Sequence, residues 1–177
     1  MRPRTHLGSV YGLHVRVGKA SALGWLVLWG ALTGMALGLL HAALFPALLG
    51  ALLAVLLHLL SELTHQWGHA WAARRTGYPM TGLQVWWAHS TSLYPRDEPA
   101  LPAEAHLWRA LGGPAFSACL ALLTAALVLA LCPVGGLLWW VVLWWCGENL
   151  VLFTLGALLP LGFTDGSSLW YWWRRRS

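Results

Sequence analysis

The sequence PALLGALLAVLLHLLSELTHQWGHAWAARRTG at residues 46–77 decides the fold, because it joins a long apolar run to two histidines near its basic end. At about 1.5 Å per residue, residues 46–75 are long enough to cross a hydrocarbon core of roughly 30 Å as one helix. His65 and His69 are four residues apart, which places both on one face of such a helix, with Cβ atoms about 6 Å apart. That spacing lets both imidazoles bind one zinc ion, so the stretch predicts a membrane-spanning helix with a candidate metal site.

The composition is that of a membrane protein. The chain has 177 residues, of which 58% are hydrophobic and 10% are charged, against roughly 25% charged residues in an average soluble domain. The net charge of +5 comes from arginines and a lysine that flank the apolar segments, which is the pattern of topology signals and not of a nucleic-acid-binding face. We therefore expect a single domain, residues 1–177, integral to a prokaryotic-type cell membrane, with the lipid bilayer around it and no nucleic acid as partner.

Four apolar segments predict an all-α polytopic membrane protein with about four transmembrane helices. The expected spans are residues 20–40, 46–75, 106–131 and 137–159. Residue types alternate weakly over residues 1–19, which predicts a surface hairpin. The composition of residues 76–104 predicts a strand-like loop followed by a proline-rich linker. Residues 160–177 are expected to form an Asp-Gly loop and a basic tail. The fold class thus includes a small membrane-associated β element before span one and between spans two and three.

The basic residues predict that both termini are cytoplasmic. They precede span one, separate spans two and three, and end the chain, whereas the other two loops carry no charge. Counting back from Arg74 and Arg174 along helices places His65, His69 and Asp165 roughly 8 to 14 Å inward from the cytoplasmic interface. A carboxylate and two imidazoles can therefore meet in the cytoplasmic leaflet.

Asp165 is the expected third metal ligand. An aspartate at the centre of a membrane helix costs at least about 2.5 kcal/mol, so Asp165 needs a partner, and a metal ion is a good one. Three protein ligands leave the fourth tetrahedral position of zinc for a water, whose pKa zinc lowers toward about 7. The set His65, His69 and Asp165 predicts metal-assisted hydrolysis with zinc as cofactor.

Gln66 departs from the metalloprotease pattern His-Glu-x-x-His at the position of the general base. An amide is neither a base nor an acid near neutral pH, although it can orient a water by hydrogen bonding. Loss of a general base typically removes about 10²–10⁴-fold in rate. Zinc binding can therefore survive in this chain while turnover collapses.

The order of the motifs resembles the site-2 protease family of zinc intramembrane metalloproteases. The resemblance rests on HQWGHA at 65–70, AARRTG at 72–77, GGP at 112–114 and LLPLGFTDG at 158–166. It implies cleavage of transmembrane or juxtamembrane segments of membrane-anchored proteins, with zinc held by His65, His69 and Asp165. It also implies that residues 80–92 offer an edge strand that holds the substrate as an extended segment. The chain looks like a minimal member without a PDZ or regulatory domain. The expected substrate-binding residues are Trp86, Gly113, Pro114 and Asn149.

The departures from the family pattern leave two explanations open. Besides Gln66, the sequence has Ser117 and Ala157 where asparagines are common, and Ser167 after the Asp-Gly pair. Gln66 indicates either a natural pseudoprotease or a deliberate replacement of glutamate that traps a substrate or stabilises the protein. In both cases the zinc-ligand set is otherwise intact.

Two further polar residues share the helix face of the histidine pair. His58 and Glu62 continue the stripe toward the other end of the span, and we expect them to hydrogen-bond around the metal ligands, with Glu62 as a less favoured substitute base. In span four, Glu148 is expected to pair with His58. Two other functions remain possible: a non-enzymatic pseudoprotease that binds membrane helices, and a four-helix haem or metal carrier using His41, His58, His65 or His69.

Overall fold

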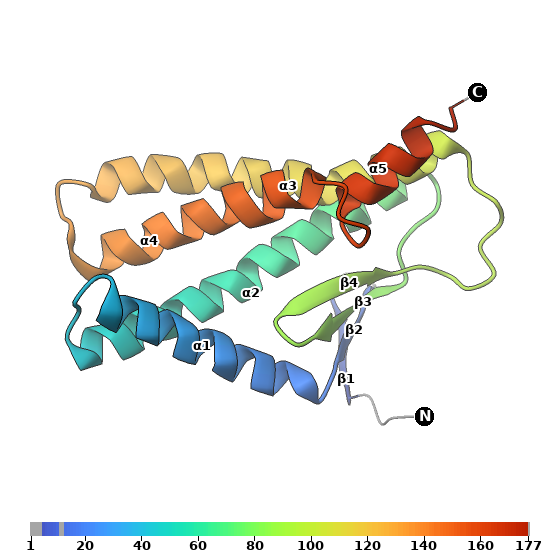
Figure 1. Cartoon of the computed structure of the whole chain (residues 1–177). Helices are drawn as coiled ribbons and strands as arrows, with labels where there is room; N and C mark the ends of the chain where they lie inside the picture. The colour runs from blue at the N-terminus through green and yellow to red at the C-terminus, as the bar shows by residue number, and fades with distance from the viewer. Residues whose placement is uncertain (1–4, 11–12, 177) are drawn as a thin grey trace.

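The computed structural model describes residues 5–10 and 13–176, and Figure 1 shows long helices packed side by side with a small sheet at one end. Within the described residues, four helical segments are long and apolar enough to cross a membrane. They are α1 (Ala20–Gly38), α2 (Leu44–Arg75), α3 (Ala103–Leu131) and the continuous segment Gly136–Gly156. The predicted all-α polytopic fold class is confirmed, and the chain is an integral membrane protein.

The fourth span changes its helix type along its length. α4 (Gly136–Glu148) continues as the π-helix η1 (Asn149–Gly156), whereas the sequence predicted one helix over residues 137–159. In this segment Asn149 Nδ2 donates to the Trp145 carbonyl oxygen at 2.8 Å, and Thr154 Oγ1 donates to the Asn149 carbonyl oxygen at 2.7 Å. Side chains that bond to carbonyls of their own helix compete with the regular backbone ladder, and here they accompany the wider π-helical turn.

The sheet combines two parts of the chain that the sequence treated as separate. Its strands are β1 (Thr5–Val10), β2 (Leu13–Val17), β3 (Gly82–Trp86) and β4 (His89–Leu93), in the order β1-β2-β3-β4. The two hairpins are antiparallel, and they join through a parallel pairing of β2 with β3. Among the described strands, β4 therefore forms one edge of the sheet while β3 lies inside it.

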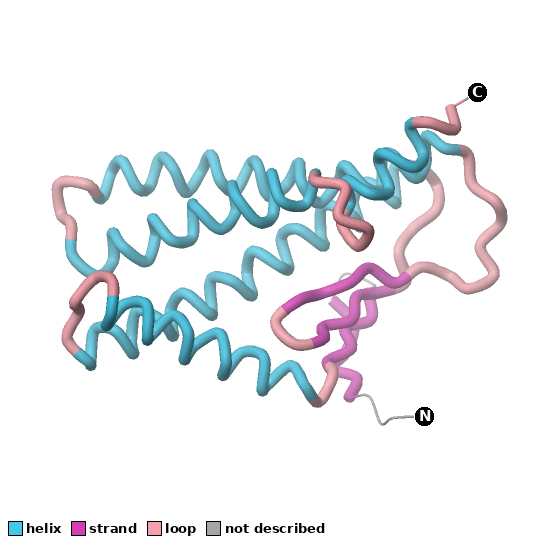
Figure 2. Tube along the Cα trace, in the orientation of Figure 1, coloured by secondary structure: helices cyan, strands magenta, loops and turns pink. Residues whose placement is uncertain are grey.

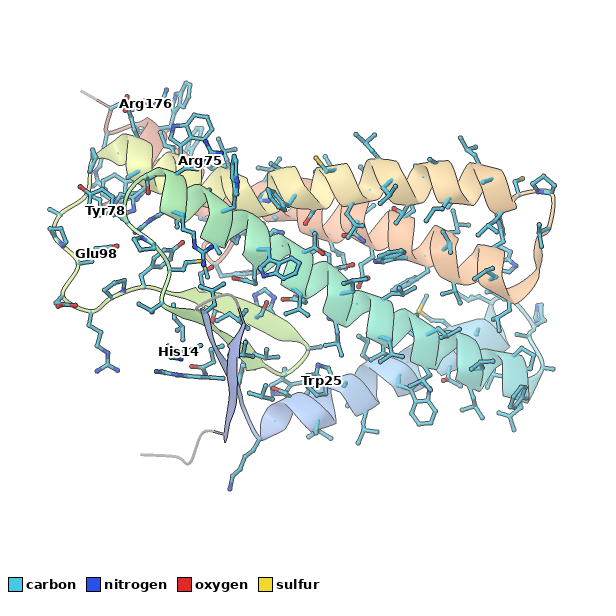
Figure 3. All side chains as sticks on the ribbon, turned by 180° about the vertical axis from the view of Figure 1, so that it is seen from behind. His14, Trp25, Arg75, Tyr78, Glu98 and Arg176 are labelled. Atoms are coloured by element: carbon cyan, nitrogen blue, oxygen red, sulfur yellow. The ribbon has the colours of Figure 1, made fainter. Side chains whose placement is uncertain are left out.

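Segments that carry basic residues lie at one end of the helix bundle. Figure 2 shows the sheet, the long loop after it and the C-terminal helix at one end of the bundle, and the α1–α2 and α3–α4 connections at the other. Figure 3 shows Arg75 and Arg176 at the same end as Tyr78 and Glu98. This arrangement agrees with the charge pattern, and the cytoplasmic placement of this end stays a prediction.

α2 and α3 pack closely because two glycines face each other. A Cβ on Gly68 would lie 2.7 Å from the carbonyl carbon of Gly112, and a Cβ on Gly112 would lie 2.8 Å from that of Gly68. Small residues at such positions let the backbones of membrane helices approach one another. The close approach brings residues of α3 next to the histidines of α2.

Candidate metal centre

The structure brings the three predicted ligands together. His65 Nε2 and His69 Nε2 lie 3.1 Å apart, and Asp165 Oδ2 lies 3.2 Å from the first and 3.4 Å from the second. Two ligands at zinc distances of about 2.0–2.1 Å in a tetrahedral site are about 3.3–3.4 Å apart, so this nearly equilateral triangle matches one face of a zinc site. Two imidazole nitrogens and a carboxylate also form a donor set of catalytic zinc, with one position left over. The residues present therefore fit the metal.

Asp165 reaches the histidines from the start of a short helix. It is the first residue of α5 (Asp165–Trp173), so it does not lie in a loop as the sequence predicted. In the preceding turn, Gly162 has a φ of 91°, and its N–H donates to Ser167 Oγ at 2.6 Å. A Cβ on Gly166 would lie 2.7 Å from the carbonyl carbon of Leu159. The Asp-Gly pair thus lets the chain turn tightly enough to aim the carboxylate at α2.

The outer ring nitrogens of both histidines have partners on α3. His69 Nδ1 lies 2.7 Å from the Arg109 carbonyl oxygen, and His65 Nδ1 lies 3.0 Å from Ser117 Oγ. Because a carbonyl oxygen only accepts, His69 carries its proton on Nδ1 and directs the Nε2 lone pair toward the centre, which is the tautomer that metal binding needs. Sequence reasoning missed these partners. A backbone carbonyl leaves no signature in a sequence, and a serine at position 117, where asparagine is common in the family, does not by itself predict a bond to His65.

Gly113 faces the ligand nitrogens of both histidines. A Cβ at this position would lie 2.6 Å from His65 Nε2 and would overlap His69 Nε2 as well. The predicted residue Gly113 is therefore adjacent to the centre, and the lack of a side chain leaves room there. Pro114, its neighbour, is buried inside α3.

Asp165 is partly buried, and its Oδ2 lies next to both imidazoles. A carboxylate must be deprotonated to bind a metal, and a neutral imidazole binds through the nitrogen that carries no proton.

Gln66 is held by strand β4. Its Nε2 donates to the Ser90 carbonyl oxygen at 3.2 Å, and its Oε1 accepts from Ser92 Oγ at 2.8 Å. The side chain is 4% exposed. The Gln66 amide thus connects α2 to the edge strand β4.

The hydrogen bonds of His58 and Glu62 go to groups other than the metal ligands, and their supporting role at the site stays a prediction. Glu62 Oε2 accepts from the Ser90 backbone N–H at 2.9 Å and from the Ser90 hydroxyl, while His58 contacts Glu148 and the Ala88 carbonyl oxygen, each at 2.6 Å. The partners of both side chains lie on other elements, so the position of His58 and Glu62 on one helix face could not predict them. The predicted pairing of His58 with Glu148 is confirmed.

The centre opens into a cavity of about 950 Å³. Its walls include the three ligands, Gln66, the β3–β4 turn and β4, and the turn before α5. None of the four residues predicted to bind substrate, Trp86, Gly113, Pro114 and Asn149, is among those that line it. Trp86 ends the interior strand β3 and is exposed, and Asn149 is fully buried, with Nδ2 donating to Ser61 Oγ at 2.9 Å.

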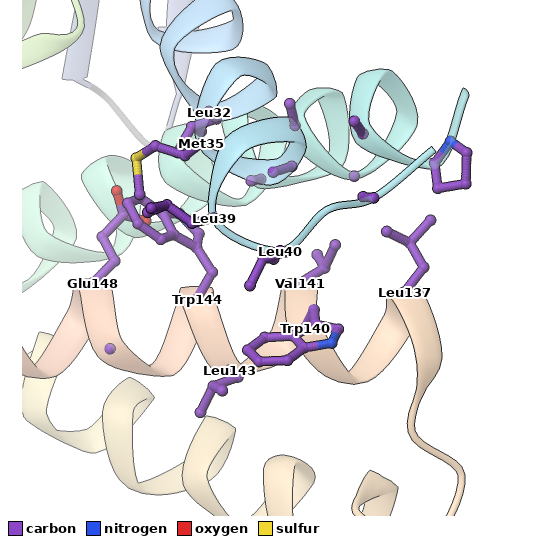
Figure 4. Close-up of a pocket in the computed structure, with 18 of the residues that line it drawn as sticks. Leu32, Met35, Leu39, Leu40, Leu137, Trp140, Val141, Leu143, Trp144 and Glu148 are labelled. Atoms are coloured by element: carbon purple, nitrogen blue, oxygen red, sulfur yellow. The ribbon is translucent and has the colours of Figure 1, made fainter. Parts of the chain in front are cut away.

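A second cavity, of about 780 Å³, lies between α1, α2 and α4 (Figure 4). Leucines and tryptophans such as Trp140 and Trp144 line it, with Glu148 toward one end of the row and Leu137 at the other. None of the three metal ligands lines this cavity.

Comparison with known proteins supports the fold. No protein-family model and no curated protein sequence matches this chain. Among solved structures, the chain is similar to a site-2 protease from Methanocaldococcus jannaschii, with a TM-score of 0.60 over 95% of this chain and 70% of that chain. The two sequences are 13% identical, so the likeness is one of fold. The chain has a fold like that of this site-2 protease, and what its site does must be argued from its own residues.

Proposed function

We propose that this chain is the scaffold of an intramembrane zinc metalloendopeptidase of the site-2 protease type, with zinc held by His65, His69 and Asp165. The observation that carries the proposal is the triangle of Nε2, Nε2 and Oδ2 atoms, with sides of 3.1, 3.2 and 3.4 Å. The position of the triangle, within a bundle of four candidate spans, favours a reaction inside the bilayer. The substrate class that follows is a membrane-anchored protein, cleaved in or next to its transmembrane segment.

The residues of the site would have different roles in hydrolysis. Bound zinc would supply a Lewis acid and an activated water at neutral pH. His65, His69 and Asp165 hold the ion, and Arg109 and Ser117 fix the orientation of the two imidazoles. Gln66 can donate and accept hydrogen bonds, but it cannot take a proton from water or give one to a leaving amine. Turnover of this exact sequence is therefore strongly impaired.

The substrate would lie as an extended segment along β4. A peptide bond in a helix is shielded by its own hydrogen bonds, whereas a strand paired to a sheet edge exposes its backbone. β4 is the edge strand nearest α2, and its residues line the same cavity as the ligands. With the basic end cytoplasmic, cleavage would take place in the cytoplasmic leaflet and both termini would be cytoplasmic.

The favoured alternative is a pseudoprotease that binds membrane segments without cutting them. Its support is the pair of hydrogen bonds that Gln66 makes with Ser90 and Ser92, since they give the glutamine a structural role in this chain. A haem carrier is less favoured, because the Nε2 atoms of His65 and His69 converge on a carboxylate at 3.2 and 3.4 Å.

The variant Gln66→Glu decides between these functions. In detergent or vesicles with zinc, the variant should cleave a membrane-anchored test substrate at least about 10²-fold faster than the parent chain, as expected when a general base is restored. The double variant Gln66→Glu with His65→Ala is the matched control and should not cleave. Zinc-loaded Gln66→Glu that binds the substrate but never cuts it would favour the pseudoprotease.

A further inference from the structure

The residues of β4 fall into two groups, according to the direction in which their backbone N–H and carbonyl groups point. The Leu93 carbonyl oxygen accepts from the Thr81 N–H at 2.9 Å, on the side of β3. Because backbone groups alternate in direction along a strand, those of His89, Thr91 and Leu93 point toward β3, and those of Ser90 and Ser92 point away from it. Ser90 and Ser92 therefore carry the hydrogen-bonding groups of the free edge.

Side chains of α2 already use this edge at Ser90. The Ser90 N–H donates to Glu62 Oε2 at 2.9 Å, and the Ser90 carbonyl oxygen accepts from Gln66 Nε2 at 3.2 Å. Glu62 and Gln66 are four residues apart, one turn of the same helix, so together they mimic the donor and acceptor of a neighbouring strand. Both are buried, as is Ser90 at 3% exposed. A partner strand needs these same two groups to pair with β4 at this point.

The contact at the Ser90 carbonyl depends on an amide at position 66. A carbonyl oxygen only accepts, and so does an ionised carboxylate, whereas glutamine offers N–H donors. The Ser90 carbonyl settles which end of the Gln66 amide faces it, and the other end then accepts from Ser92 Oγ at 2.8 Å. A glutamate at this position could keep the contact with Ser92 and would lose the one with Ser90.

We infer that Glu62 and Gln66 are positioning residues that close the free edge of β4, and that an extended segment pairs with β4 only after they release Ser90. This inference rests on the proposed function in taking β4 as the strand along which a substrate lies. Gln66 then has two effects: it cannot act as a general base, and it blocks the edge of β4. Gln66→Glu both restores a proton acceptor and opens the edge to a partner.

Hydrogen–deuterium exchange of the full-length protein in lipid nanodiscs tests the closed edge. We expect residues 88–93 to exchange roughly two- to tenfold faster in Glu62→Met, which removes the acceptor of the Ser90 N–H, and also faster in Gln66→Met, in which β4 loses a contact with α2, than in the parent chain. Ser92→Ala removes one bond to Gln66 without touching α2 and should give a smaller increase, which keeps the test decisive if the other variants fold poorly. Thr64→Ala is the matched control, since the Thr64 hydroxyl donates to the Leu60 carbonyl oxygen of its own helix. Unchanged exchange in all three test variants would overturn the inference.

A photo-crosslinking experiment tests the role of the edge in binding. A photoreactive residue at Thr91, whose side chain is exposed, would capture a membrane-anchored peptide with an extended juxtamembrane segment in the same vesicles. We expect severalfold more crosslinking in Gln66→Met than in the parent or in Thr64→Ala, and the same ratio after zinc is removed with a chelator. If the ratio holds and the protein never binds zinc, the proposed protease function fails and the closed edge stands. If zinc binds normally and crosslinking does not rise, the closed edge is contradicted and the metal site is not.

Discussion

Gly113→Ala should abolish tight zinc binding without removing any ligand. The added Cβ would lie 2.6 Å from His65 Nε2, whereas ordinary van der Waals contacts begin at 3.4 Å. Either His65 Nε2 must therefore shift by about 0.8 Å, or α3 must move away from α2. Metal sites tolerate ligand displacements of about 0.2 Å. Movement of α3 is restrained, because Gly112 packs directly on Gly68.

The expected loss has two components. Overpacking costs about 1–3 kcal/mol, which lowers the midpoint of thermal denaturation by roughly 2–12 °C in a chain of this size. A metal ligand set disturbed in its orientation loses about 10–100-fold in affinity, and a displaced ligand atom should lose at least that much. Chelator competition measures the zinc affinity, and thermal denaturation in detergent measures the stability.

Two control variants separate these components. Gly112→Ala also overpacks the α2–α3 contact, with a Cβ 2.7 Å from that of Ala72, but the nearest atoms it would meet are not ligand atoms. It should lose stability and keep more of its zinc affinity. Gly147→Ala meets nothing within 4 Å and should leave both unchanged. Parental zinc affinity in Gly113→Ala would refute the placement of the metal among these three atoms.

Two further predictions concern ion pairs outside the metal centre. His58→Leu leaves Glu148 buried without its partner and should destabilise the protein by about 3–5 kcal/mol, whereas the double variant with Glu148→Leu should recover most of that loss in the same denaturation assay. Glu98 accepts a hydrogen bond from Arg109 Nη1 at 2.9 Å, which lowers the pKa of its carboxyl group below the model-compound value of 4.5. The pair therefore stabilises the fold above pH 4.5, and this contribution is lost as the pH falls through the lowered pKa. A pH series of denaturation midpoints should show the loss in the parent chain and not in Glu98→Gln.

The sequence could predict the helices and the ligand set because both leave local patterns. Apolar runs of sufficient length identify the spans, and the spacing of His65 and His69 follows from helix geometry. Asp165 could be added because an isolated aspartate near a membrane span needs a partner.

The rest depends on contacts between distant segments. Alternation of residue types indicates a strand but not its neighbour in the sheet. The parallel pairing of β2 with β3, which makes β4 an edge strand and β3, with Trp86 at its end, an interior strand, could therefore not be foreseen. The partner of His69 is the backbone carbonyl of Arg109, and backbone groups are the same in every residue. Gln66 could be recognised as a missing base, whereas its bonds to Ser90 depend on where β4 lies.

Zinc content is the most direct test of the central claim that His65, His69 and Asp165 form one metal site. The protein should be purified without chelators, exposed to zinc, freed of unbound metal and analysed by elemental analysis for zinc per chain. We expect about one zinc per parent chain, loss of that zinc in His65→Ala and Asp165→Ala, and its retention in His41→Ala, whose histidine lies in the α1–α2 connection. Unchanged zinc in His65→Ala or Asp165→Ala would contradict the site.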